Sequence, residues 1–279
     1  MPVFKIRKKT EKNRFKDMRV FLFLMLMLAG SSCYKRVEGC IDPLSSNFNP
    51  NADDSCDDCC KNPFLKMTLK HQLADTFYSP SDSMQNDLGQ WYKLLDFSYY
   101  LSGFTLSGQD GQALTGERFS EFVFQNQKKL IKDNFLLIRP TTFDYSINEI
   151  RQYGTFDSLI FIFGLEDSIR RADVIHVEKT HVLSDSIFIR DGNGQKSWCN
   201  LTIAKGVNFS DTLRLSFALT KPETVISLAA PFSNTIGKDL VMTVIADYAA
   251  WFGTTDLNLP EEQLKETLRG NLKALFRVK

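Results

Sequence analysis

The chain is poor in the residues and motifs on which most enzymes depend. Its 279 residues include only three histidines, and no segment matches the nucleophile elbow G-x-S-x-G, the P-loop or the dinucleotide fingerprint G-x-G-x-x-G. The acidic pairs at Glu166-Asp167 and Glu261-Glu262 are typical of solvated turns or of the start of a helix. We therefore predict that the protein is not an enzyme.

From Cys33 onward, the chain also lacks an excess of basic residues. Eight of the 34 Lys and Arg residues precede position 33, but only two of the 33 Asp and Glu residues do. The formal charge of +1 therefore becomes −5 from Cys33 onward. Nucleic acids bind basic surfaces, because contact with phosphates releases counterions. The charge pattern argues against nucleic acid as a partner.

No apolar run is long enough to span a bilayer as a helix. The longest, Val20 to Gly30, has eleven residues, whereas a spanning helix needs about 20. A basic stretch from Lys5 to Arg19 precedes this run, and Ser31-Ser32-Cys33 follows it. This order predicts a cleaved signal peptide over residues 1–32, with Met18 as an alternative start.

Cys33 resembles the acylated cysteine of a bacterial lipoprotein signal. The resemblance implies that Cys33 begins the mature chain and carries acyl chains such as palmitate, which anchor it stably in the outer membrane. The alternative is a plain secretory signal with Cys33 in a disulfide. Because Tyr34-Lys35-Arg36 is not an acidic run, we expect the periplasmic side of the membrane rather than the cell surface.

Residues 33–63 have too few large apolar side chains to build a core. The segment from Gly39 to Cys60 resembles a short Cys-bounded module of exported Bacteroidetes proteins, with the pattern C-x-D-P-x-A-x-N-[FY]-[ND]-P. We predict a membrane-proximal linker, closed by a disulfide between the cysteines that bound the module, Cys40 and Cys56. The pairing of Cys59, Cys60 and Cys199 stays open.

This linker is rich in oxygen ligands. Five Asp and three Asn lie between Ile41 and Asp58, and Ca²⁺ takes six to eight oxygen atoms. Asp53 and Asp54 are therefore candidate calcium ligands, although their spacing does not fit an EF-hand. The alternative is a solvated spacer that holds the next domain off the membrane.

From Phe64 onward the dominant hydrophobic period is two, which indicates strands with one buried face. The first of them places alternate residues on one face, namely Met67, Leu69, His71 and Leu73. Further strands are expected at 95–106, 121–124, 135–138, 143–147, 158–165, 186–189, 197–203, 212–219, 224–228, 240–248 and 272–278.

Turns and composition support the same fold class. Gly-rich turns are expected at 108–111 and 191–194, helices at 260–268 and 83–95, and a mixed loop or helical insertion at 166–185. The 23 phenylalanines suit aromatic packing between sheets. We predict an all-β domain over residues 64–279, an antiparallel sandwich or barrel of about ten strands.

Three stretches of this domain resemble the MbnP-like family of methanobactin-associated copper-binding proteins. Residues 97–106, FSYYLSGFTL, are similar to the family's strand that begins with Tyr-Tyr. Residues 153–167, YGTFDSLIFIFGLED, are similar to its G-x-Y-x-x-I-x-F-x-I-G-V-D segment, and MTVIADY at 242–248 is similar to its closing strand. The resemblance implies a β-sandwich that binds copper, with His71 where some relatives also carry His.

The sequence departs from that family where copper ligands are expected. Relatives carry a Trp- and Tyr-rich segment after G-V-D, but residues 166–190 contain neither. His176 and His181 lie five positions apart, so a helix or a strand would turn their rings to different faces. His71 is thus the candidate copper ligand, because imidazole is a ligand that copper prefers.

Three functions agree with these observations. The first, which we expect, is a lipid-anchored binding protein of the cell envelope; the second is a copper handler. The third is a structural or interaction lipoprotein of an outer-membrane assembly. His converging with Trp or Met in one pocket would favour the second, and a large exposed aromatic patch the third. The cofactor, copper or calcium, stays open.

Overall fold

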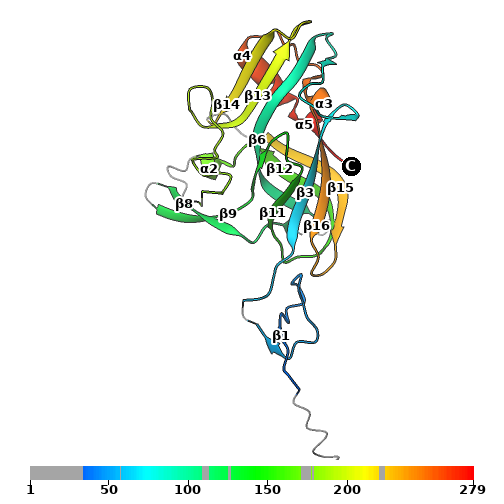
Figure 1. Cartoon of the computed structure of the whole chain (residues 1–279), viewed down its shortest axis with the longest axis vertical. Coiled ribbons are helices and arrows are strands. Elements are labelled where there is room, and N and C mark those ends of the chain that lie inside the picture. Colours follow the sequence, from blue (N-terminus) through cyan, green and yellow to red (C-terminus); the bar gives the residue numbers. More distant parts are fainter. Residues whose placement is uncertain are drawn as a thin grey trace, which may run out of the picture.

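The computed structural model describes residues 34–56, 58–108, 113–124, 127–170, 177, 179–219 and 224–279. The predicted signal peptide, Cys33, His176 and most of the turn expected at 108–111 lie outside these residues. The described part is a β-sandwich body with a small module at one end (Figure 1). The predicted antiparallel sandwich is confirmed, and within the described residues neither main sheet closes into a barrel.

The larger sheet is built around one long strand, β6 (Trp91–Ser107). Its order is β14 (Asp211–Ala218), β13 (Ser197–Lys205), β6, β12 (Gly154–Phe163) and β15 (Thr224–Asn234), and three short strands also pair with β6, namely β5 (Met84–Gln85), β7 (Ala113–Leu114) and β10 (Phe135–Ile138). All these pairings are antiparallel.

Within β6, Gly103 has a φ of +64°, and a Cβ there would lie 2.8 Å from the Glu166 carboxylate. This position therefore requires glycine.

The smaller sheet contains the first and the last long strands of the body. Its order is β11 (Asp144–Glu149), β3 (Phe64–Leu73), β16 (Leu240–Asp247) and β17 (Phe276–Val278), with β4 (Thr76–Phe77) also paired to β3. β3 and β16 run parallel, so that Leu65 lies beside Leu240. Alternate residues of β3 are buried, as the period of two predicts.

Short helices and one further hairpin complete the body. The helices are α2 (Asp167–Arg170), α3 (Tyr248–Phe252), α4 (Glu261–Gly270) and α5 (Leu272–Leu275), and the hairpin joins β8 (Phe119–Phe124) to β9 (Gln127–Lys132). α4 confirms the helix predicted at 260–268 and begins directly after Pro260, whose fixed φ suits a helix start. No helix in the described ranges is long and apolar enough to cross a membrane.

Two local predictions are wrong, and a third holds only for Phe276–Val278, which forms β17. The helix expected at 83–95 is replaced by β5 and the start of β6, where Tyr92 and Leu94 point to the core with a period of two. Residues 186–189 form turns rather than a strand, and the segment expected as a strand at 272–278 begins with α5. Short apolar runs of this kind do not distinguish a strand from a turn of helix.

Aromatic rings fill the space between the sheets. Tyr99 of β6 stacks on Phe163 of β12, with 4.8 Å between ring centroids, and Phe163 contacts the edge of Trp198 at 5.4 Å. Trp251 of α3 closes the same cluster and donates its indole N–H to the carbonyl of Leu268. Because each fully buried side chain of this size contributes about 2 kcal/mol or more, these rings add substantially to the stability of the body.

The module at the N-terminal end consists of residues 34–63 and holds itself together with side-chain oxygens. Its two-residue strands β1 (Glu38–Gly39) and β2 (Asp54–Ser55) pair in parallel. The amide of Asn47 donates to the Cys59 carbonyl at 2.7 Å and accepts from the Lys61 N–H at 2.8 Å. These two bonds, termed the Asn47 clamp, hold residues 59–61 beside Asn47.

The disulfides of the module correct the predicted pairing. Cys40 bonds to Cys60, with 5.0 Å between their Cα atoms, and not to Cys56, which bonds to Cys59. The Asn47 clamp explains the difference, because it brings residues 59–61, rather than Cys56, to the side of Cys40. Cys199 is free and buried in the body.

Several contacts hold the module against the body, among them a hydrogen bond from the Asn62 amide to Glu149 at 2.9 Å. Asp42 pairs with Arg151 at 2.7 Å. The loop between β15 and β16 also approaches the module closely, since a Cβ on Gly237 would lie 2.8 Å from the carbonyl oxygen of Ser45. Gly237 has a φ of +68°, so both its backbone angle and the close approach require glycine.

The disulfide pattern can be tested by proteolysis. Cleavage before Asp57 and Asp58 separates Cys56 from Cys59 and Cys60. With the pairing seen here, the non-reduced digest contains one species in which the fragments bearing Cys40, Cys56 and the Cys59-Cys60 pair are joined. A Cys40–Cys56 bond would instead release the Cys59-Cys60 fragment, and mass spectrometry distinguishes the two.

Removing the outer bridge should lower stability. In the chain-entropy model, closing a loop with a sequence separation of 20 contributes about 3 kcal/mol. We expect Cys60→Ser to make the module, but not the body, sensitive to proteases under native conditions. Cys199→Ser changes a thiol in the body and serves as the control for the module.

Candidate functional site

His71, the candidate copper ligand, lies inside the body on the buried face of β3. Its side chain is 1% exposed. Nε2 lies 3.0 Å from the carbonyl oxygen of Thr142, and Nδ1 lies 2.8 Å from the hydroxyl of Tyr248. Because a carbonyl oxygen only accepts, Nε2 carries the hydrogen and Nδ1 accepts from Tyr248. Both ring nitrogens are therefore used by the protein itself.

These bonds belong to a longer buried chain that joins the two sheets. The hydroxyls of Tyr99 in β6 and Tyr248 in α3 lie 3.2 Å apart, and Tyr145 of β11 donates to the same Thr142 carbonyl at 2.9 Å. Burial lowers the pKa of His71 to about 4 and raises the pKa of Tyr248. At neutral pH none of the side chains in this series of hydrogen bonds carries a charge.

The described residues do not fit a copper site at this position. A metal needs a free nitrogen lone pair, and the only lone pair of neutral His71 is engaged by the Tyr248 hydroxyl. Met67, on the same strand face, is 1% exposed and packs in the core, as predicted. Within the described ranges no three His, Cys, Asp or Glu residues are grouped to hold a metal ion.

His181 is engaged in a different way, beside the β8–β9 hairpin. Its Nε2 donates to Asp133 at 3.0 Å, and its Nδ1 accepts from the Leu183 N–H at 3.1 Å. Burial opposes ionisation of Asp133, but hydrogen bonds from His181 and Ser120, with the charge of Arg118, hold its pKa below the usual value. Ser120 bonds to Asp133 and not to His181, so this is not a nucleophile triad.

The candidate calcium ligands also bond to other groups of the protein. Asp53 accepts from the Val37 N–H at 2.9 Å, a bond that lowers its pKa, and Asp54 pairs with Arg36 at 3.3 Å. Asp42 accepts from the Leu44 N–H at 3.0 Å. The oxygens thus fix turns of the backbone instead of converging on one point. Asp57 lies outside the described residues.

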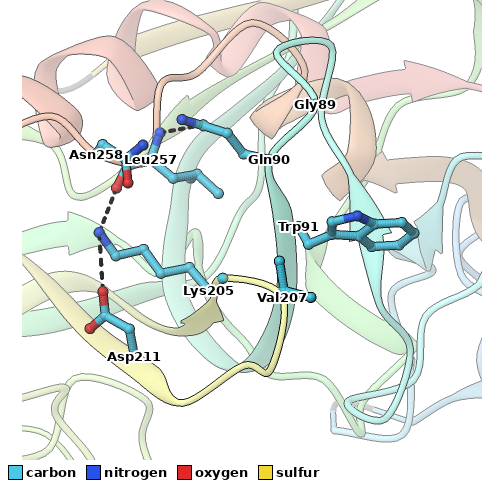
Figure 2. Close-up of a pocket in the computed structure, with 9 residues that line it drawn as sticks. Gly89, Gln90, Trp91, Lys205, Val207, Asp211, Leu257 and Asn258 are labelled. Atoms are coloured by element: carbon cyan, nitrogen blue, oxygen red, sulfur yellow. Dashed lines mark hydrogen bonds and ion pairs between the residues drawn. The ribbon is translucent and has the colours of Figure 1, made fainter.

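A pocket of about 230 Å³ lies at the opposite end of the sandwich from the module. Its lining comes from three separate segments of the chain, at 89–91, 205–211 and 257–258. The ammonium of Lys205 donates to the Leu257 carbonyl at 2.8 Å and pairs with Asp211 at 3.4 Å. Figure 2 shows Lys205 reaching toward Leu257, while the indole of Trp91 points away from Lys205.

Hydrogen bonds between two loops hold this pocket in shape. Gln90 accepts from the Leu257 N–H at 2.8 Å and donates to Asp256 at 2.6 Å. Asn86 donates to the carbonyl of Thr255 at 2.7 Å. An ammonium has three N–H donors, and two of those on Lys205 have partners among the residues that the structure describes. The pocket can therefore offer one fixed donor to a small polar group.

Apolar side chains surround this pocket at the end of the molecule. Leu88 is 54% exposed, Trp91 41% and Val207 82%. No pattern in the sequence marks these residues, because Gln90, Lys205 and Leu257 are brought together only by the tertiary fold. Trp91 gave no signal either, because the sequence predicted a helix over 83–95.

Similarity to known proteins is distant. Among solved structures, the chain is similar to MbnP from Methylosinus trichosporium, with 11% sequence identity over 70% of this chain and 79% of that chain, and a TM-score of 0.41. No protein-family model and no curated protein sequence matches the chain. No conclusion about function follows from so distant a similarity.

The burial of His71 predicts an acid-dependent loss of stability. His71 is neutral in the folded protein down to about pH 4, but in the unfolded chain it takes up a proton below its ordinary value of 6.5. The contribution of neutral His71 to the free energy of unfolding is therefore fully present above pH 6.5. About 3 kcal/mol of that free energy is lost as the pH falls to about 4. Gln can replace both hydrogen bonds without titrating.

Urea unfolding of the wild type and of His71→Gln, followed across this pH range, checks the prediction. We expect the free energy of unfolding to fall more steeply with acid in the wild type than in His71→Gln. Equal slopes in the two proteins would show that His71 is charged or exposed in the folded state. His181→Gln is the matched control, since it removes a histidine outside the buried chain.

Proposed function

We propose that this chain is a lipid-anchored, non-catalytic binding protein of the bacterial cell envelope, which contacts its ligand or partner through the end of the sandwich farthest from the anchor. One observation carries the proposal. The module that follows Cys33 lies at one end of the molecule, and the turn between β13 and β14, which lines the pocket, lies at the other (Figure 1).

The shape and chemistry of the far end agree with a contact surface. A pocket of about 230 Å³ is below the usual size for a whole drug-sized ligand, so it suits a small molecule or a single side chain of a partner. The exposed apolar residues around it would add area to such a contact. A purely structural lipoprotein is the alternative, but it gives no role to the fixed donor of Lys205.

The anchor is tested by cell fractionation. We expect Cys33→Ala to move the protein from the outer-membrane fraction to the soluble fraction, because one thiol carries the acyl chains. Ser31→Ala, which keeps a small residue beside the cleavage site, should stay with the membrane. Outer-membrane localisation of Cys33→Ala would rule out the lipid anchor.

Copper binding, which the sequence resemblance raised, has its own test. Because the nitrogens of His71 and His181 are engaged by the protein, we expect the full chain to retain no equimolar copper after loading and dialysis. Metal analysis of the wild type and of His71→Gln should give the same low content. Equimolar retention that His71→Gln abolishes, with an unchanged circular dichroism spectrum, would contradict this expectation.

A further inference from the structure

Four strands end the two main sheets, and in the described part of the chain three of them are protected against pairing with another strand. β15 contains Pro231 and lies against β16 and β17. β11 has a register shift between Ser146 and Asn148, and its Glu149 carbonyl accepts from the Glu117 N–H. β17 has only three residues. Proline, bulges, short length and cover by other segments are the usual means of protecting a sheet edge.

β14, at the other end of the larger sheet, has none of these features. It is eight residues long and contains no proline, and the extra residue at its register shift, Trp198, belongs to β13. No backbone hydrogen bond joins β14 to a described residue outside β13. Alternate residues of a strand point their N–H and C=O groups to the same side, so a row of these groups faces outward along β14.

A groove of about 610 Å³ follows this edge. On one side it is lined by Thr202 and Arg214, which pair across β13 and β14 and face away from the core. On the other side it is lined by Glu261 and Lys265 of α4, which lies beside β14 (Figure 1). The two buried leucines of α4 join the central hydrophobic cluster, so this helix is on the core side of the sheet. A groove that touches both sides of β14 must pass around its free edge.

The cations of the groove differ in whether the protein itself pairs them. Arg190 pairs with Asp185 at 2.6 Å, and Lys265 pairs with Glu261. The exposed guanidinium of Arg214, in contrast, forms no hydrogen bond or ion pair with any residue that the structure describes. A strand added at this edge would therefore meet an unpaired positive charge near the middle of β14.

A free edge strand with a helix beside it suits the addition of a peptide as a further strand. In this mode of recognition, main-chain hydrogen bonds supply the affinity and alternate side chains supply the specificity. Eight residues at about 3.3 Å each give β14 a length of about 26 Å, which matches a peptide of roughly six to eight residues. Side chains on one face of the peptide would lie beside Arg214, and those on the other face would lie toward the half-buried Leu213 and α4.

We propose that β14 binds an extended peptide of a partner protein as an additional strand, between its free edge and α4. The peptide alternates polar and apolar side chains. An acidic side chain lies opposite Arg214, because opposite charges across a strand pair are favourable, and apolar side chains continue the inner row that begins with Leu213. This inference does not depend on the lipid anchor or on the pocket of Figure 2.

Fluorescence polarisation on the full chain in detergent tests the added strand. The labelled probe is the peptide Gly-Ser-Val-Thr-Val-Asp-Val-Thr-Val-Ser-Gly. One derivative is N-methylated on the two valines that flank Asp and another on the two threonines, so each blocks N–H groups on one edge of the peptide strand. We expect one derivative to bind at least about tenfold more weakly than the probe and the other to bind like the probe. Absence of probe binding, or equal binding of the two derivatives, would overturn the proposal.

A charge exchange tests the position of the peptide. Arg214→Glu should weaken binding of the probe at least about threefold, and should strengthen by a similar factor the binding of a peptide in which Lys replaces Asp. Lys238→Glu makes the same change of charge in the exposed loop between β15 and β16 and should alter neither affinity.

Two results would contradict this position. Unchanged affinities for both peptides in Arg214→Glu would exclude β14 as the site. A wild type that is dimeric without peptide, and that Arg214→Glu makes monomeric, would show that β14 pairs with a second copy of the chain instead of a peptide. Size-exclusion chromatography with light scattering distinguishes this case, and we expect a monomer.

Discussion

The structure depends on a buried chain of hydrogen bonds that runs from Tyr99 through Tyr248 and His71 to Thr142. The surrounding core is aromatic and excludes water, so each polar group in it must find a partner inside the protein. Aliphatic and aromatic side chains pack together in this core, and the chain of bonds links β3 through α3 to β6.

In this arrangement the interior polar groups stabilise the fold, and groups at the surface remain for ligands. The interior histidine is used to hold the sheets together, and the acidic oxygens of the module hold turns of backbone. What remains for ligands lies outside, at the loop end and along the free edge of β14. The polar side chain of Gln90 at the pocket is fixed by its neighbours, because it accepts from the Leu257 N–H and donates to Asp256.

The sequence alone predicted the class of fold but little of the site. The period of two in residues 64–73 predicted β3, and it also placed His71 on the buried face with Leu69 and Leu73, an indication that it belongs to the core. Spacing could not choose between Cys56 and Cys60, because that choice depends on the Asn47 clamp. Nor could it find β14 as an unprotected edge, since this needs the order of the strands in the sheet.

The parallel pairing of β3 with β16 joins segments that are far apart in the chain, as in the bond from the Phe64 N–H to Asp239 across 175 positions. The module that precedes β3 closes through local contacts alone. The module can therefore close without the rest of the chain, whereas β3 can pair fully only when β16, near the other end of the body, is present. Until then its apolar face has no partner, and the nascent chain needs protection from aggregation.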